Sequence, residues 1–281
     1  MRLIVTRPLA QALPAVQELR AHGVDAHALP LIGIEALPDN DPLADALSTA
    51  RATLARRRLV MFVSANAVAH FFAAPGYPAW PAGTLAGSTG PGTSAALRAA
   101  GVPAACLREP AADAERLDTE ALWQQLRALD WRGASVLVVR GEGGRDWLAE
   151  TLRGAGANVD FVTAYRRTLP RLDAAQAVLL EEAQANPAGH AWHFTSSEAV
   201  QNLPRLTADS AGAWRASTAL VTHPRIGEAA RAIGFAHLQA LAPGLAALLR
   251  AWQALVGAAA GNTTRPGEGA GDTTQPAEGR R

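Results

Sequence analysis

The sequence contains no lysine, because all of its 26 basic residues are arginine. This absence excludes a Schiff-base lysine, a lysine general base and the phosphate-binding lysine of Walker-type sites. An Ala-, Arg- and Pro-rich composition is also typical of a GC-rich genome, which would explain the missing lysine without reference to function. The basic residues are balanced by 25 acidic ones, and a net charge of +1 gives no electrostatic indication of a nucleic-acid partner or an anionic membrane.

Cysteine and long apolar runs are also scarce. Cys106 is the single cysteine, which excludes an internal disulfide and a metal site built from thiolates alone. The opening MRLIVTRPLAQ is less apolar than the ~7–15-residue core of a secretory signal, and no run approaches the ~18 residues of a membrane span. We therefore expect a cytoplasmic protein with no membrane partner. Apolar residues make up 49% of the chain, which is enough for a sizeable core.

An internal repeat runs through the chain in three blocks. LIVTRPLAQALPAVQELRAHGVD aligns with LVVRGEGGRDWLAETLRGAGANVD, so that Arg7 matches Arg140 at an offset of 133 residues. FVSANAV aligns with FTSSEAV at an offset of 132, which places Ser64 over Ser196. GPGTSAALRAAGV aligns with HPRIGEAARAIGF, again 133 residues apart. Three blocks in the same order at nearly one offset indicate a duplicated unit.

Each block has the pattern of a strand, a turn and a helix. LIVT and VLVV are short β-branched runs of buried-strand length, and the helical stretches after them stop at glycines. Alternating strands and helices predict parallel sheets with helices on both faces. Ligands of such sheets bind at the carboxyl ends of the strands, where the Ser-, Thr- and Gly-rich turns fall. Ser64 and Ser196 are equally well placed to cap the helices that follow them.

Other candidate motifs are weak. The glycines of GEGG, residues 141–144, lack the spacing of a dinucleotide site. His190 and His193 lie on opposite faces of a predicted strand, which makes them poor co-ligands for a metal ion. The tryptophans are scattered, so they give no stacking platform for nucleic acid. Residues 257–281 are rich in Gly, Thr, Pro and Glu, and we expect a disordered tail there. The strand-end turns and their arginines favour holding a large polyanion over attacking it.

Seven short segments, taken together, resemble uroporphyrinogen-III synthases across residues 1–256. They are VTRP at residues 5–8, FVSANAV at 62–68, GPGTSAALRAAGV from 90, DTEALW at 118–123, VLVVRGEGGRDWLAETLRGAG from 136, VTAYRR at 162–167 and FTSSEAV from 194. The resemblance implies two flavodoxin-like α/β domains joined by a two-stranded linker. Residues 1–35 and 168–256 would form one domain, and residues 36–167 an inserted second one. The tetrapyrrole would lie in the cleft between the domains.

The implied reaction closes linear hydroxymethylbilane to uroporphyrinogen III, with inversion of ring D and loss of water. No metal or cofactor is implied, and we expect a monomer without nucleic-acid partners. A spiro intermediate would follow departure of the hydroxyl group. Because hydroxymethylbilane also closes unaided to the unflipped isomer, the protein mainly has to impose geometry.

The resemblance also implies site residues. Tyr165 in VTAYRR matches the family's tyrosine, and a protonated tyrosine hydroxyl could assist departure of the leaving group as a general acid. Tyr165 could instead simply anchor the linker. The last block departs from the family, because Arg225 and Ile226 stand where many members have threonines; Thr222 or Arg225 could substitute. The implied substrate-binding residues are Arg7, Ser64, Asn66, Thr93, Arg140, Ser196, Ser197, Thr222 and Arg225.

A different class of function remains open at this stage. A non-catalytic two-domain protein that closes on a small anionic ligand, such as a sugar phosphate or a nucleotide, would show the same repeat and the same strand-end turns. The absence of a signal segment argues against a periplasmic binding protein, and the glycine spacing argues against a nucleotide.

Overall fold

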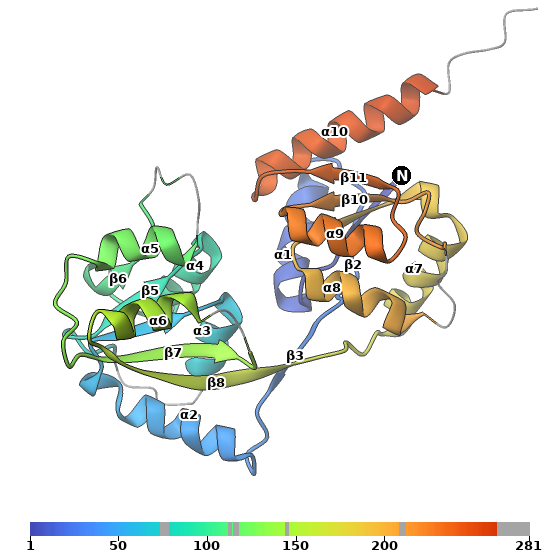
Figure 1. Cartoon of the computed structure of the whole chain (residues 1–281). Helices are drawn as coiled ribbons and strands as arrows, with labels where there is room; N and C mark the ends of the chain where they lie inside the picture. The colour runs from blue at the N-terminus through green and yellow to red at the C-terminus, as the bar shows by residue number, and fades with distance from the viewer. Residues whose placement is uncertain (74–78, 112–113, 115–117, 144–145, 208–211, 263–281) are drawn as a thin grey trace, which may run out of the picture. The chain divides into compact units, whose positions relative to one another are not determined.

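The computed structural model describes residues 1–262, except for 74–78, 112–113, 115–117, 144–145 and 208–211. The chain divides into two compact units (Figure 1). Unit 1 consists of Met1–Leu31 and Leu172–Arg281, and unit 2 of Ile32–Arg171. The domain boundaries expected from the sequence, after residue 35 and before residue 168, stay a prediction. The expected α/β class with two mainly parallel sheets is confirmed.

Unit 1 holds a parallel sheet with the strand order β11-β10-β9-β1-β2. If the five strands are numbered in chain order within this unit, they lie side by side in the order 2-1-3-4-5. This is the strand order of flavodoxin-like folds. The strands are β1 (Arg2–Val5), β2 (Ala26–Ala28), β9 (His190–Phe194), β10 (Thr218–Val221) and β11 (His237–Ala240). The helices are α1 (Leu9–Ala21), α7 (Ala174–Ala185), α8 (Ser197–Asn202), α9 (Pro224–Ala232) and α10 (Leu245–Asn262).

Unit 2 has the order β3-β8-β7-β4-β5-β6, in which β3 pairs antiparallel with the end of β8 and the other pairs are parallel. The strands are β3 (Gly33–Ala36), β4 (Leu59–Phe62), β5 (Leu85–Ser88), β6 (Leu107–Arg108), β7 (Ser135–Gly141) and β8 (Asn158–Thr168). The helices are α2 (Pro42–Ala52), α3 (Ala65–Phe71), α4 (Pro91–Ala99), α5 (Thr119–Leu126) and α6 (Trp147–Gly154). β3 and β8 lead to the two places where the chain passes between the units.

The repeat is divided between the two units. β1 lies in unit 1 and its repeat partner β7 in unit 2, whereas β4 lies in unit 2 and its partner β9 in unit 1. The pairing registers nevertheless agree residue for residue: Leu3 pairs with Ala191, and Val136 pairs with Leu59, which are the repeat equivalents. Each unit is therefore a complete flavodoxin-like sheet assembled from parts of both copies.

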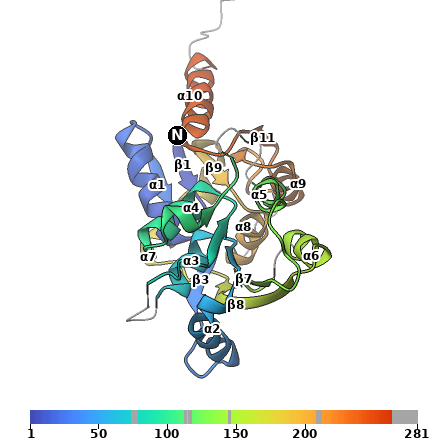
Figure 2. The ribbon, with the colours of Figure 1, turned by 90° about the vertical axis from the view of Figure 1, so that its left-hand side faces the viewer.

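Helices cover both faces of each sheet. In unit 2, α2, α3 and α4 pack on the face that carries Val60 and Leu137, and α5 and α6 pack on the face that carries Met61 and Val138 (Figure 2). In unit 1, α1 and α10 cover the face of Ala191. The opposite face carries an aromatic cluster formed by Trp192, Phe194, Trp214 and Phe235.

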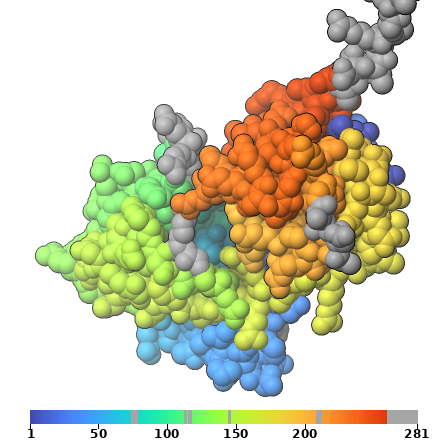
Figure 3. Space-filling model, turned by 45° about the vertical axis from the view of Figure 1, so that its right-hand side comes forward, coloured from blue at the N-terminus to red at the C-terminus, as the bar shows by residue number. Residues whose placement is uncertain are grey.

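The last helix is longer than the sequence predicts. Helix α10 runs to Asn262, six residues into the segment expected to begin the tail at Gly257. The alanine run at residues 258–260 explains the extension, because alanine has the highest helix propensity. The rest of that segment lies outside the described residues. Helices α9 (orange) and α10 (red) both reach the surface of unit 1 (Figure 3). Within the described part of the chain, no helix is long and apolar enough to cross a membrane.

Candidate functional site

The site residues expected in unit 1 gather at one edge of its sheet. Arg7 follows β1, Ser196 and Ser197 follow β9, and Thr222 and Arg225 follow β10. These three strands are neighbours and parallel, so their carboxyl ends meet at the same edge. β1 and β9 also flank the point where the strand order reverses, which is the usual ligand position in open α/β sheets.

The site residues expected in unit 2 take the equivalent edge. Ser64 and Asn66 follow β4, Thr93 follows β5, and Arg140 and Tyr165 lie near the ends of β7 and β8. Thr93 is almost fully buried in the first turn of α4. The structure therefore brings the expected residues together in two groups, one in each unit.

Both repeated serines cap helices. Ser64 Oγ accepts a hydrogen bond from the Ala67 amide at 3.1 Å, and Ser196 Oγ accepts one from the Glu198 amide at 3.2 Å. The capping role considered from the sequence is thus confirmed for both. A hydroxyl group has one proton and two lone pairs, so a cap bond leaves each serine able to make further hydrogen bonds.

Tyr165 is buried and hydrogen-bonded to Ser64. A register irregularity between β7 and β8 places Tyr165 opposite Gly141, and the side chain is only 1% exposed. Its hydroxyl lies 3.2 Å from Ser64 Oγ, and its ring stacks on His70 at a centroid distance of 5.6 Å. Burial and the Arg51 charge lower the pKa of His70, so this neighbour is uncharged at neutral pH. Ser64, which is half-buried, is the group through which the tyrosine hydroxyl reaches the strand-end surface.

The ring of Tyr165 depends on the glycine opposite it. A Cβ atom at Gly141 would lie 2.8 Å from two ring carbons of Tyr165. We expect Gly141→Ala to displace the ring, break the hydrogen bond to Ser64 and lower the free energy of unfolding by about 1–2 kcal/mol. The melting temperature, measured by thermal denaturation, and the turnover rate should both be lower in this variant.

The control for that substitution is Gly154→Ala. Gly154 is an exposed residue of α6, and an added Cβ meets nothing within 4 Å. It should keep full turnover and gain a few tenths of a kcal/mol from helix propensity. If Gly141→Ala behaved like Gly154→Ala, the packing argument for Tyr165 would be wrong.

Arg140 and Arg7 are repeat equivalents in different surroundings. Arg140 donates to Asp146 at 2.6 Å, and its guanidinium carbon lies 3.9 Å from the centroid of the Phe161 ring. Residue 13, the repeat equivalent of Asp146, is Leu13, so Arg7 lacks that partner. Among the described residues, no acidic side chain forms an ion pair with Arg7, and burial lowers its pKa. Of these two arginines, Arg7 is therefore the one whose charge is still available to a ligand.

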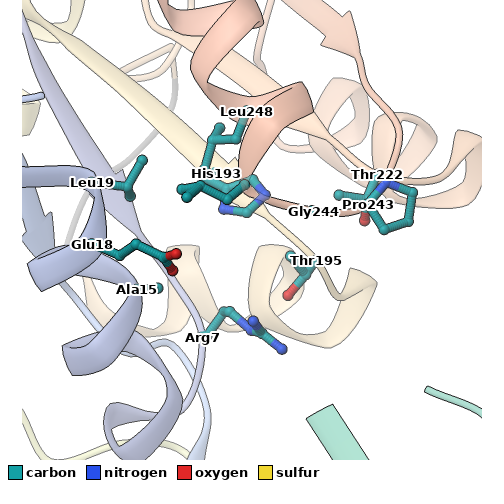
Figure 4. A pocket seen from close by; sticks show the side chains of 11 residues that line it. Arg7, Ala15, Glu18, Leu19, His193, Thr195, Thr222, Pro243, Gly244 and Leu248 are labelled. Carbon is teal, nitrogen blue, oxygen red and sulfur yellow. The ribbon is translucent and has the colours of Figure 1, made fainter. Parts of the chain in front are cut away.

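A cavity of about 270 Å³ lies within unit 1 beside Arg7, and we call it the unit 1 cavity (Figure 4). Helix α1, the ends of β9 and β10, and the start of α10 surround it. Of the expected residues, Arg7 and Thr222 line it, while Arg225 is exposed on α9 and does not. Its lining is Arg7, Ala15, Glu18, Leu19, His193, Thr195, Thr222, Pro243, Gly244, Leu245 and Leu248.

His193 is a residue of this cavity that the sequence analysis missed. The sequence pattern presents it only as a poor metal ligand, whereas the structure makes it the buried last-but-one residue of β9. Burial and the neighbouring Arg7 charge lower its pKa to about 4, so the imidazole is neutral at pH 7. The repeat indicates that His193 is unusual, because the equivalent residue in unit 2 is the core residue Met61. A polar residue at a core position of a repeat points to a role other than packing.

Two other expectations concern glycine and histidine motifs. In the GEGG segment, Gly141 and Gly143 are described, and Gly144 lies outside the described residues. His190 Nδ1 lies 2.8 Å from the Asn186 carbonyl oxygen, apart from His193. Within the described ranges, no group of three or more His, Cys, Asp or Glu side chains could hold a metal ion.

Comparisons with known proteins agree on one family. A family model described as uroporphyrinogen-III synthase HemD matches residues 14–250. The uroporphyrinogen-III synthase of Salmonella typhimurium is 34% identical over 217 residues, which cover 74% of this chain and 80% of that protein. A crystal structure of a mutant uroporphyrinogen III synthase from Thermus thermophilus shares the fold, with a TM-score of 0.55 at 19% identity over 92% of this chain and all of that one. The Helicobacter pylori synthetase has a TM-score of 0.55 at 15% identity, over 91% of this chain and all of that one.

Proposed function

The chain belongs to the uroporphyrinogen-III synthase family, and from this premise we propose how its residues act on hydroxymethylbilane, the substrate that the family implies. The activity is that of a hydro-lyase in tetrapyrrole biosynthesis. The net reaction loses one water. The C–O bond of the hydroxymethyl group breaks, ring D inverts, and the tetrapyrrole macrocycle closes with loss of a proton. Positioning the flexible chain for closure through the substituted carbon of ring D is the main task of the protein.

Carboxylate binding is the first task of the strand-end residues. The substrate carries eight carboxylates, and the charge-assisted hydrogen bonds of arginine are the strongest that the chain offers them. The available charge of Arg7 is the observation that supports this most directly. We propose Ser196, Ser197 and Thr222 as further hydrogen-bonding groups in unit 1, and Asn66 and Thr93 in unit 2. Arg140 and Arg225 stay predictions with smaller expected contributions, because Arg140 is paired and Arg225 lies outside the unit 1 cavity.

Protonation of the leaving hydroxyl is the second task, and we assign it to Tyr165 acting through Ser64. In this assignment the Tyr165 O–H is the donor to Ser64 Oγ, which also accepts the Ala67 N–H, so both lone pairs are used and the Ser64 proton is left to donate. As the C–O bond breaks, Ser64 gives its proton to the departing oxygen and takes one from Tyr165, and water leaves. The proton lost when the ring recloses restores the tyrosine hydroxyl, so the pair returns to its starting state.

We expect Tyr165→Phe to lower kcat about tenfold with little change in KM, because a general acid acts in the transition state. Ser64→Ala should have the same kinetic effect and also cost about 1 kcal/mol of stability through the lost cap. Single-turnover kinetics and thermal denaturation measure the two effects.

The matched control removes a cap alone. Asp173 accepts from the Gln176 amide at 2.8 Å at the start of α7. Asp173→Ala should lose about 1 kcal/mol of stability and keep its kcat. If Ser64→Ala kept its kcat as well, Ser64 would be a helix cap and nothing more.

The function itself is tested by the isomer formed. Hydroxymethylbilane is incubated with catalytic amounts of the protein, the products are oxidised, and the isomers are resolved by chromatography. The type III isomer supports the proposal. Only the type I isomer, together with tight binding of an anion, would support the alternative of a non-catalytic binding protein. We further propose a monomer, which sedimentation at working concentration would test.

A further inference from the structure

One nitrogen of the His193 imidazole has no hydrogen-bond partner in the described part of the chain. Its Nδ1 is buried and makes no hydrogen bond to any described residue, and the residue as a whole is 9% exposed. A buried N–H without an acceptor is unfavourable, which favours the tautomer with Nδ1 unprotonated and the proton on Nε2. Because Nδ1 is the buried nitrogen, Nε2 is the one that a ligand in the unit 1 cavity can reach, and His193 lines that cavity (Figure 4).

The cavity has an apolar side and a polar side. Ala15 and Leu19 of α1 and Leu248 of α10 form the apolar side. The polar groups are the Arg7 guanidinium, the Thr195 and Thr222 hydroxyls, the His193 imidazole and the Glu18 carboxylate, and the start of α10 at Leu245 lies beside them. The first amides of an 18-residue helix have no partner within the helix and carry a partial positive charge. A ligand that matches both sides has a short hydrocarbon part and one anionic end.

We propose that the unit 1 cavity binds a single carboxylate-ended side arm, with Arg7 and His193 at its charged end. A propionate-type arm fits better than phosphate, because phosphate would leave the leucine side of the cavity without a complementary group. The inference rests on the proposed function in one respect, since the natural ligand would be a side arm of the substrate. It adds to that function a defined pocket and a residue, His193, that the resemblance does not supply.

Carboxylate binding in this cavity is linked to proton uptake. A carboxylate beside the imidazole favours its charged form, so binding raises the pKa of His193 from about 4. By reciprocity, carboxylate affinity rises as the pH falls through the raised pKa of the liganded state toward about 4, and it is flat well above that pKa. The charged side chains that line the cavity are Arg7 and Glu18. Glu18 is exposed on α1 and repels an anion, so Glu18→Gln should tighten binding about threefold.

Propionate is the probe for this inference. The full chain, labelled with ¹³C at histidine, is titrated with sodium propionate at constant ionic strength, and the pKa of His193 is read from its ring signals. We expect that pKa to rise by at least one unit at saturation, and the rise to vanish in Arg7→Gln. Propionamide, which has the same shape without the charge, should produce no rise.

Three results would overturn the inference: no rise with 100 mM propionate, an equal rise with inorganic phosphate, or a rise that persists in Arg7→Gln. The isomer assay separates this failure from failure of the proposed function. Type III product without a His193 response rejects the cavity alone, whereas a response without type III product rejects the synthase activity alone. His193→Met, which copies the repeat partner, should fold and raise KM for hydroxymethylbilane with kcat unchanged.

Discussion

Replacing Arg7 by glutamine is expected to lower kcat/KM for hydroxymethylbilane about 50-fold. A charge-assisted hydrogen bond contributes about 1.5–3 kcal/mol, and a 50-fold loss corresponds to ~2.4 kcal/mol. The loss should be large because Arg7 is partly desolvated before substrate binds and has no acidic partner among the described residues to compete for it. Steady-state kinetics at pH 7.5 measures the change, and most of it should appear in KM.

Arg140→Gln is the matched comparison, since Arg140 is the repeat equivalent of Arg7. Its guanidinium is already engaged by Asp146 and by the Phe161 ring, so we expect a loss of about threefold in kcat/KM. It should also lose some stability, whereas Arg7→Gln should not. Equal losses in the two variants would show that the difference in local environment has no bearing on substrate binding.

The second large effect is on acid stability. Between its unfolded pKa near 6.5 and its folded pKa of about 4, His193 binds a proton in the unfolded chain and not in the folded one. Stability contributed by the neutral imidazole is therefore fully present above pH 6.5 and is lost as the pH falls to 4. Relative to His193→Met, the wild type should lose roughly 3 kcal/mol across that window. Urea denaturation at half-unit pH steps measures the difference.

His237→Met is the control that removes an exposed histidine instead of the buried His193. His237 is exposed on β11, and its replacement should leave the pH dependence of stability parallel to that of the wild type. Parallel curves for the wild type and His193→Met would contradict the assignment of His193 as a buried neutral group.

The strands and helices could be predicted from the sequence because they depend on short patterns of neighbouring residues. The runs at LIVT and VLVV became β1 and β7, and the glycines that end their helices, Gly23 and Gly156, both have positive φ. The edges that carry the candidate site residues followed from the same pattern, since parallel strands place their carboxyl ends together. The family resemblance supplied the assignment of Tyr165.

Other features depend on long-range contacts that no local pattern encodes. The two copies have nearly the same strand–turn–helix pattern, so only pairing decides that β9 joins β1 while β7 joins β4. The burial of Tyr165 depends on its facing Gly141 across two strands. His193 was overlooked because a histidine on a strand is informative only once its surroundings are known. The comparison of His193 with Met61 within the repeat was the available signal.

The isomer ratio at increasing enzyme concentration tests the central claim most directly. Without protein, hydroxymethylbilane closes to the type I isomer, so the product ratio compares the catalysed and uncatalysed rates in one sample. The account predicts that the type III fraction rises with enzyme until it dominates, and that Arg7→Gln needs about 50 times more enzyme to reach the same ratio. A product that stays type I at every enzyme concentration would contradict it.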